Sequence, residues 1–323
     1  MASALASGFA WPTAFAQAPA RWRKDWPRTD FSRTSVALSE ILDAGPGRDG
    51  IPAIAAPGYV PIDQTYPLKL ADTEPLIVLK VGGDVRLYPL RIMTRHEIVN
   101  DTVGGAPILV TYCPLCNSAV AFERRVAGGS PLFGVTGKLR NSNLIMYDLE
   151  SESWWQQFTG DAIVGARAGE RLKAIAVHIA PYREARGSYP HGRILAPPVD
   201  SESAYRNPYV RYDSRRAPYP FAEVKLPAGI QPMAYVVAVG ARAWPLQQLA
   251  DTGKIETGDL LLTWTRGMNS ALDTADIGRG RDIGSIRVQQ RIDGAYRDVR
   301  HEFTFAFVFR TFNPDGIIAG SSR

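Results

Sequence analysis

Residues 77–90, IVLKVGGDVRLYPL, decide the fold. Two apolar, β-branched segments flank a Gly-Gly turn, a pattern typical of a β-hairpin. A related stretch, YVVAVGARAWPL, occupies residues 235–246. Further along each copy, ILVTYCPLCNSA (residues 108–119) matches LLLTWTRGMNSA (residues 260–271) position by position. The sequence therefore predicts a β-rich scaffold that is built twice within one chain.

The two cysteines of the chain, Cys113 and Cys116, lie in the first copy only. When the two copies are aligned, Cys113 falls on Thr265 and Cys116 falls on Met268. A scaffold that is also built without thiols does not need them in order to fold. The cysteines are therefore an addition to one copy or a loss from the other, and they mark where the chemistry is expected.

The predicted fold class is α+β, predominantly β, with two related β-rich halves and a few short helices. The strands follow one another too closely for alternating βαβ units. One of the short helices is expected between Ser35 and the Gly45-Pro46 stop. The expected organisation is an export signal or disordered leader at 1–20, an extended lead-in with this helix at 21–74, the first β-rich half with the CPLC motif at 75–179, an irregular Pro/Tyr/Arg-rich connection at 180–230, and the second β-rich half at 231–323.

The composition excludes several classes of protein. The chain has 323 residues and a net charge of +5, but its basic residues are scattered and form no nucleic-acid-binding motif. No segment is long and apolar enough for a membrane span. The first 20 residues are uncharged and Ala-rich, and Ala18 and Ala20 have the spacing of a signal-peptidase site, although the usual basic start is missing. We expect an extracytoplasmic protein, periplasmic or secreted, with a disordered leader as the alternative.

Cys113 and Cys116, in CPLC, allow three interpretations. The pair can bind a soft metal as thiolates, with copper or zinc as the candidates, or it can exchange electrons, or it can be structural. Pro114 suits the first turn of a helix or a tight loop. Zinc usually has four ligands and no second CxxC is present, so a metal would need further ligands from elsewhere in the chain.

The segment directly before the cysteine strand offers such ligands. His96, Glu97, Asn100 and Asp101 lie in HEIVND, and a hairpin could return His96 toward Cys113 to form a Cys2His core. The alternative is a helix end and a turn, because Asn and Asp are common turn residues.

A third cluster lies between residues 137 and 165 and is rich in amide and hydroxyl groups. Beside its two tryptophans, these groups would suit a polar pocket with aromatic walls, although the tryptophans are equally explained as core. The chain contains no Ser-His-Asp order, P-loop, dinucleotide fingerprint or HExxH, so no catalytic residue is assigned. The candidate pocket-lining residues are Glu97, Asn100 and Asp101 of the segment before the cysteine strand and, from this cluster, Arg140, Asn141, Ser142, Asn143, Asp148, Trp155, Gln157 and Thr159.

Five stretches, DGIPAI, YPLRIMTRHEIVND, VTYCPLCNSAVAFER, FGVTGKLRNSNLIMYD and ESWWQQFTGDAIVG, together resemble the prokaryotic family known as domain of unknown function 3179. The resemblance covers roughly residues 33 to 315 and is most specific up to Gly165. It implies an extracytoplasmic protein and carries no settled activity. This chain has Asn117 where members typically have Gly. The matched positions are His96, Glu97, Asn100, Asp101, Cys113, Pro114, Cys116, Asn141, Ser142, Asn143, Asp148, Trp155, Gln157, Thr159 and Gly160.

The first functional hypothesis is an extracytoplasmic protein that binds a soft transition metal through Cys113 and Cys116, with His96 as a further ligand. The second is a thiol–disulfide redox protein. The third is a module that binds a small ligand or serves as a scaffold, in which the cysteine pair is structural. The expected partner is accordingly a metal or a small molecule rather than nucleic acid.

Overall fold

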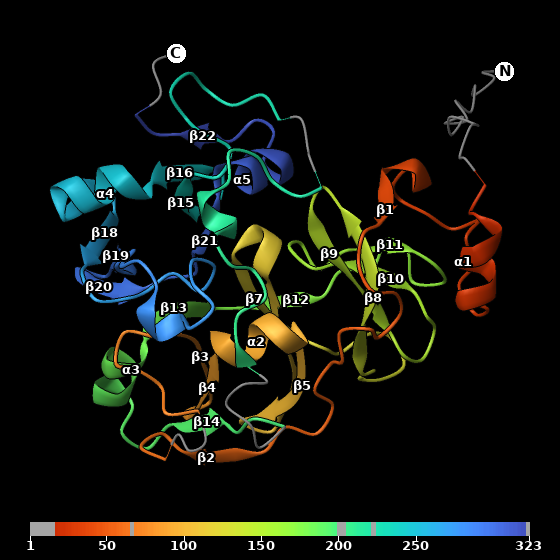
Figure 1. Cartoon of the computed structure of the whole chain (residues 1–323), viewed down its shortest axis with the longest axis horizontal. Coiled ribbons are helices and arrows are strands. Elements are labelled where there is room, and N and C mark those ends of the chain that lie inside the picture. Colours follow the sequence, from red (N-terminus) through yellow and green to blue (C-terminus); the bar gives the residue numbers. More distant parts are fainter. Residues whose placement is uncertain (1–16, 65–67, 199–204, 221–223, 321–323) are drawn as a thin grey trace, which may run out of the picture.

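A computed structural model describes residues 17–64, 68–198, 205–220 and 224–320 of the chain. Five small β-sheets form a propeller-like ring, and the α-helices are short (Figure 1). The predicted class, β-rich α+β with repeated halves, is confirmed. Within the described residues, none of the helices has the length and apolarity needed to cross a bilayer.

Each half contributes a sheet in which a hairpin is flanked by two later strands. In the first half the strand order is β13-β3-β4-β14-β2, and in the second it is β21-β15-β16-β22. In both, the flanking strand beside the first hairpin strand is antiparallel and the other is parallel, so the topology repeats. The bounds are β2 (Tyr59–Pro61), β3 (Pro75–Val81), β4 (Asp84–Pro89), β13 (Val177–Pro181), β14 (Arg193–Leu195), β15 (Tyr235–Val239), β16 (Arg242–Pro245), β21 (Glu302–Phe305) and β22 (Ile317–Ile318).

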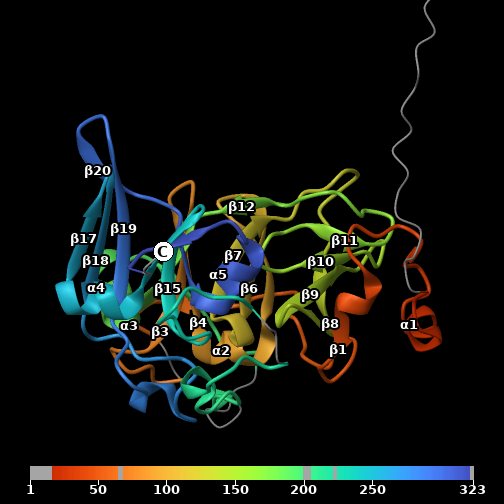
Figure 2. The same cartoon turned by 90° about the horizontal axis from the view of Figure 1, so that it is seen from above.

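Each half also contributes a four-stranded antiparallel sheet, with the orders β12-β7-β6-β5 and β20-β19-β18-β17. The registers agree, because Cys113 is paired with Ser118 in the first half and Thr265 with Ser285 in the second. Figure 2 shows the β19–β20 hairpin projecting at one end of the molecule. The bounds are β5 (Ile98–Val103), β6 (Ala106–Cys113), β7 (Ser118–Glu123), β12 (Lys173–Ile175), β17 (Lys254–Thr257), β18 (Leu260–Thr265), β19 (Ser285–Ile292) and β20 (Ala295–Asp298).

Helices connect these sheets at equivalent places. α2 (Leu90–His96) and α4 (Leu246–Thr252) each follow a proline and end at a residue in the left-handed conformation. That residue is Gly253 after α4, with φ +71°, and Glu97 after α2, with φ +57°. Glycine is the usual residue at such a position, so Glu97 adopts a backbone conformation that costs a non-glycine residue about 1 kcal/mol. α3 (Tyr182–Ser188) and α5 (Ala306–Phe312) directly follow β13 and β21, the equivalent strands of the two halves.

The fifth sheet is an insertion into the first half. Its strands β8 to β11 lie between β7 and β12 in sequence, and β1 from the lead-in joins them to give the order β1-β8-β9-β10-β11. In the second half, β19 passes directly into β20 through Asp293 and Gly294, so the described residues 224–320 contain no equivalent insertion. The bounds are β1 (Ile41–Asp43), β8 (Phe133–Arg140), β9 (Asn143–Asp148), β10 (Trp154–Gln156) and β11 (Ala162–Val164).

The N-terminal arm covers the outer face of this inserted sheet. α1 (Ala20–Asp25) places Trp22 and Trp26 against Trp154, with ring centroids 5.2 and 5.5 Å apart. Residues 1–16 of the expected leader lie outside the described residues. Ala18, one of the two small residues at the expected cleavage site, is buried.

Two local predictions differ from the structure. The helix expected after Ser35 is wrong, because only a single turn forms, at Leu38–Glu40, and β1 then pairs with β8. Pairing at a sheet edge outweighs the local helical pattern there. The connection expected to be irregular at 180–230 contains α3 and β14, both of which complete the first repeat.

Candidate functional site

The CPLC motif forms the tight connection between β6 and β7. Residues Pro114–Cys116 make one 3-10 turn, with Pro114 at its first position, and Asn117 closes the turn in the left-handed conformation with φ +48°. Asparagine tolerates this conformation better than most residues. Both cysteines are free thiols, with exposed fractions of 1% for Cys113 and 0% for Cys116.

The inserted sheet supplies the polar groups around the sulfurs. The Cys116 thiol donates to the carbonyl oxygen of Ser142 over 3.4 Å, and the Asn143 amide donates to the Cys116 Sγ over 3.3 Å. Burial raises the pKa of the Cys116 thiol, and the neighbouring Cys113 and Glu97 raise it further, against the lowering effect of Asn143. The environment therefore favours thiol over thiolate.

The amide cluster predicted as pocket lining is a buried hydrogen-bond network instead. Asn141 and Ser142 form the turn between β8 and β9, both with positive φ, as expected for a two-residue hairpin loop. Gln157 donates to Thr111 Oγ1 at 2.9 Å and accepts from the Ser118 hydroxyl at 3.0 Å. These contacts attach the inserted sheet to the cysteine sheet.

Other predicted lining residues also have structural partners. Trp155 donates its indole N–H to buried Asp148 at 3.0 Å, and Asn100 bonds both backbone groups of Phe133. Asp101 accepts from the hydroxyls of Tyr59 and Tyr88. Arg140 pairs with Glu40 at 2.7 Å, and Thr159 Oγ1 accepts from the backbone of Asp161.

Of the predicted residues, Glu97 alone lines the cleft beside the CPLC turn, which has a volume of about 470 Å³. Its exposed fraction is 5%. The backbone is fixed on both sides, because Glu97 N donates to Met93 O and Glu97 O accepts from Tyr112 N. Within the described part of the chain the carboxyl has one hydrogen-bond partner, the Tyr209 hydroxyl at 3.0 Å. Burial raises the pKa of Glu97 to about 7, and the Tyr209 hydrogen bond offsets part of that rise.

The opposite wall of the cleft comes from the connection between the two halves. Tyr212 donates to the carbonyl of Leu115, the residue between the cysteines, at 3.1 Å and accepts from Tyr219 N at 3.2 Å. Burial raises the pKa of Tyr212, and the two cysteines add to that effect. The connection is therefore docked directly on the CPLC turn, whose Leu115 lines the cleft.

The character of the cleft is mixed. Ile51, Leu115 and Leu144 contribute apolar walls, and Arg211 and Arg215 line the same cleft but are exposed to solvent. Neither arginine side chain has a hydrogen bond or ion pair with any other described residue. The Arg215 guanidinium lies 5.9 Å from the centre of the Tyr212 ring. The cleft thus combines an apolar interior, one buried acid and a cationic rim.

His96 does not join the cysteines. Its Nδ1 is 2.8 Å from the carbonyl oxygen of Pro52, and its ring lies beside that of Tyr205. Burial lowers the pKa of His96. The described residues contain no group of three or more His, Cys, Asp or Glu side chains placed to hold a metal ion, so the expected Cys2His core does not form.

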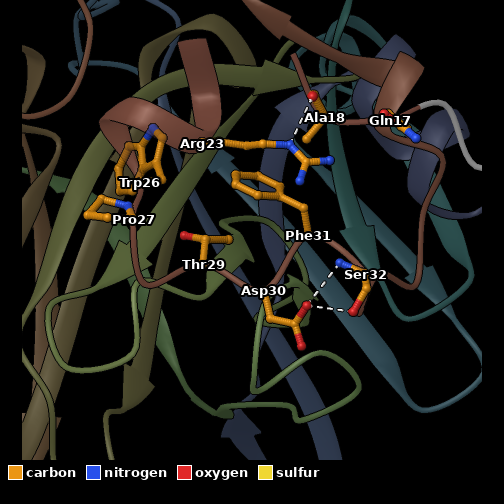
Figure 3. A pocket seen from close by; sticks show the side chains of 9 residues that line it. All are labelled: Gln17, Ala18, Arg23, Trp26, Pro27, Thr29, Asp30, Phe31 and Ser32. Atoms are coloured by element: carbon orange, nitrogen blue, oxygen red, sulfur yellow. Dashed lines mark hydrogen bonds between the residues drawn. The ribbon is translucent and has the colours of Figure 1, made fainter. Parts of the chain in front are cut away.

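A second hollow, of about 460 Å³, lies on the N-terminal arm (Figure 3). Its polar groups are bonded locally: Arg23 Nε donates to Ala18 O, and Asp30 accepts from Ser32. None of its lining residues belongs to either repeat, and it contains none of the chemistry predicted from the sequence.

Tyr209, Tyr212, Arg211 and Arg215 were missed by the sequence prediction. They lie in the segment that was expected to be an irregular connection, and the density of tyrosine and arginine there was the only available signal. Their approach to Glu97 is a long-range contact that no local pattern encodes.

The comparisons with known proteins give one match. A family described as "Protein of unknown function (DUF3179)" matches residues 48–316. No curated protein and no solved structure matches the chain.

Proposed function

The chain belongs to the DUF3179 family of unknown function, and we propose that it binds a small organic anion with an apolar body in the cleft above the CPLC turn. One observation carries the proposal. Glu97 is a buried carboxyl at an apolar, tyrosine-lined cleft. Among the described residues its carboxyl has a single hydrogen-bond partner, and Arg211 and Arg215 at the rim have no ion pair.

The chemistry of the cleft divides the ligand into two parts. An anionic group is recognised by Arg211 and Arg215 at the rim, because guanidinium groups bind carboxylates through paired hydrogen bonds. An apolar body fills the interior between Leu115, Leu144 and the tyrosine rings. Protonated Glu97 carries no charge and therefore leaves the cleft neutral beside this body. Ionised Glu97 would repel the anion, so binding strengthens as the pH falls below 7.

The cysteines do not line the cleft, and in this proposal they take no part in binding. Burial raises the pKa of the Cys116 thiol and disfavours a thiolate at that residue, whereas a soft-metal site that uses both sulfurs requires one. A stoichiometric copper or zinc ion in protein purified without a tag, lost in Cys113→Ser, would support the metal hypothesis instead. An extracytoplasmic location remains our expectation.

The test is a thermal-shift series with benzoate, phenylacetate and octanoate, each compared with its uncharged amide. We expect the carboxylates to raise the Tm of the wild type in a saturable way and the amides to have a smaller effect, since a ligand stabilises the state that binds it. Arg215→Gln should weaken carboxylate binding about tenfold, the loss expected for one charge-assisted contact.

Arg216→Gln is the matched control, because Arg216 is exposed and adjacent but does not line the cleft. It should bind the carboxylates as the wild type does. The proposal fails if none of the three carboxylates binds, or if Arg215→Gln binds them as tightly as Arg216→Gln.

A further inference from the structure

A hollow of about 450 Å³ lies in the second half where β18 ends and β19 begins. Strands β18 and β19 form one side, and the start of α3 from the first half forms the other. The hollow contains three guanidinium groups, three hydroxyl groups and one carboxyl group. Its lining residues are Pro181, Arg183, Glu184, Thr263, Thr265, Arg266, Ser285 and Arg287.

This hollow is the counterpart of the surface that the inserted sheet covers in the first half. Thr263 corresponds to Thr111: Thr111 Oγ1 donates to the carbonyl of Val120 at 2.7 Å, and Thr263 Oγ1 donates to the carbonyl of Arg287 at 3.5 Å. In the first half, Gln157 of the insertion bonds the Thr111 hydroxyl and buries it.

The second half has no such cover within residues 224–320, so Thr263 and Thr265 border an open space. Ser285, which pairs with Thr265 as Ser118 pairs with Cys113, donates instead to Glu184 of α3 at 2.8 Å. The duplicated scaffold thus presents the same polar face twice, once filled by an amide and once open beside arginines.

The arginines of the hollow differ in their partners. Arg287 pairs with Asp298 at 2.7 Å, and Arg266 lies 3.5 Å from Asp282, so both are partly neutralised. The Arg183 side chain has no hydrogen bond or ion pair with other described residues. Its guanidinium lies against Gly267, where an added Cβ would come within 3.0 Å of Nη2.

The single carboxyl group that lines the hollow is Glu184, which accepts from the Ser285 hydroxyl. The lining therefore has an excess of positive charge, with Arg183 as its unpaired cation. Glu184 and Arg287 also line an adjoining cavity of about 790 Å³, which Tyr189, His178 and His301 border, so the hollow opens toward space for a larger molecule.

We propose that this hollow binds the phosphate or sulfate group of a small molecule, with Arg183 and the Thr265 hydroxyl as its principal donors. Guanidinium and hydroxyl groups are the side chains that coordinate tetrahedral oxyanions, and arginine does so through two parallel N–H bonds. The site is separate from the Glu97 cleft, with which it shares no lining residue.

Calorimetric titration of the full chain with inorganic phosphate and with sulfate tests the proposal, with chloride at matched ionic strength as the reference. Saturable binding is expected for the wild type. Arg183→Gln should weaken it at least tenfold, because one charge-assisted contact is lost. Arg186→Gln is the matched control: it lies on the same helix, pairs with Asp72 at 3.3 Å and does not line the hollow.

Arg215→Gln distinguishes binding in this hollow from binding in the Glu97 cleft. Because Arg215 lines only the cleft, the variant should leave phosphate binding unchanged. Absence of saturable binding to the wild type overturns the proposal. So does equal binding by Arg183→Gln and Arg186→Gln, or loss of phosphate binding in Arg215→Gln but not in Arg183→Gln, which would assign the anion to the cleft.

Discussion

Glu97 combines a left-handed backbone conformation with a buried carboxyl. Each of these two features lowers the stability of the folded protein, and the rest of the structure compensates for the loss. Gly253 takes the same position in the second repeat without either cost. Strained backbone and buried charge concentrate at functional sites, because selection for stability alone would replace the residues that carry them. The comparison of the two repeats therefore marks Glu97 as a functional residue more clearly than it marks the cysteines.

The raised pKa of Glu97 predicts how stability depends on pH. The folded protein keeps the proton up to about pH 7, whereas the unfolded chain releases it near pH 4.5, so the free energy of unfolding falls as the pH rises between these values. Glu97→Gln removes this dependence. We expect the variant to match the wild type at pH 4.5 and to be more stable at pH 8 by about 3 kcal/mol.

Urea unfolding at the two pH values measures the difference. Glu150→Gln, a change at an exposed carboxylate, serves as the control and should leave the pH dependence intact. If Glu97→Gln is no more stable than the wild type at pH 8, then Glu97 is ionised in the folded protein without penalty.

At the residue scale, sequence reasoning reached part of the site. It found the CPLC turn, and it named Glu97 as a neighbour of the cysteines. It assigned the amides near Asn143 to a pocket, whereas they bond one another, because a polar pattern does not reveal whether its partners are protein groups or a ligand. His96 was placed with the thiols because sequence proximity was the only available guide.

At the scale of elements, the ends of the equivalent helices α2 and α4 show what the fold requires. Gly253 has φ +71° and open space around the position of a Cβ, so a side chain there would be strained but would meet no clash. Gly187, within α3, has ordinary backbone geometry and equally open surroundings. A comparison of Gly253 with Gly187 therefore separates the effect of backbone strain on stability from the effect of side-chain packing.

Gly253→Ala is expected to lower the free energy of unfolding by about 1 kcal/mol, since the left-handed conformation disfavours a Cβ. Gly187→Ala is the matched change and should raise it by about 0.5 kcal/mol, because alanine restricts the unfolded chain and favours helix. Chemical denaturation of the two variants gives both values. Equal effects would contradict the assignment of strain to the helix end.

The elements that sequence reasoning predicted best are those held by local pairing. The hairpins β3–β4 and β15–β16 follow from their apolar segments and short turns. The helix expected after Ser35 was wrong, because β1 obtains its partner from β8, almost a hundred residues later, as in the pairing of Ile41 with Arg140. Strands with such distant partners have no local signature.

At the scale of the whole molecule, the two halves share one hydrophobic core, which includes Leu76 and Phe122 as well as Val237 and Phe305. The duplication was visible in the sequence because aligned residues repeat. The insertion was not visible in the sequence, because it begins and ends between two strands that pair with each other and leaves the turn residues around it unchanged. The cleft depends on the meeting of four parts of the chain: the lead-in loop, the segment from Glu97 to Leu115, the inserted sheet and the inter-half connection. This placement requires the folded structure.

The insertion also has a consequence for the order in which the molecule assembles. In the second repeat, β19 and β20 pair across the short Asp293-Gly294 turn. In the first repeat, β12 reaches β7 only after the whole inserted sheet, as in the pairing of Lys173 with Glu123. Closing the longer loop costs more chain entropy, and distant pairings form later in folding. In pulse-labelled hydrogen exchange during refolding, the amides of β20 should become protected before those of β12. Simultaneous protection would mean that the inserted sheet docks before either edge strand pairs.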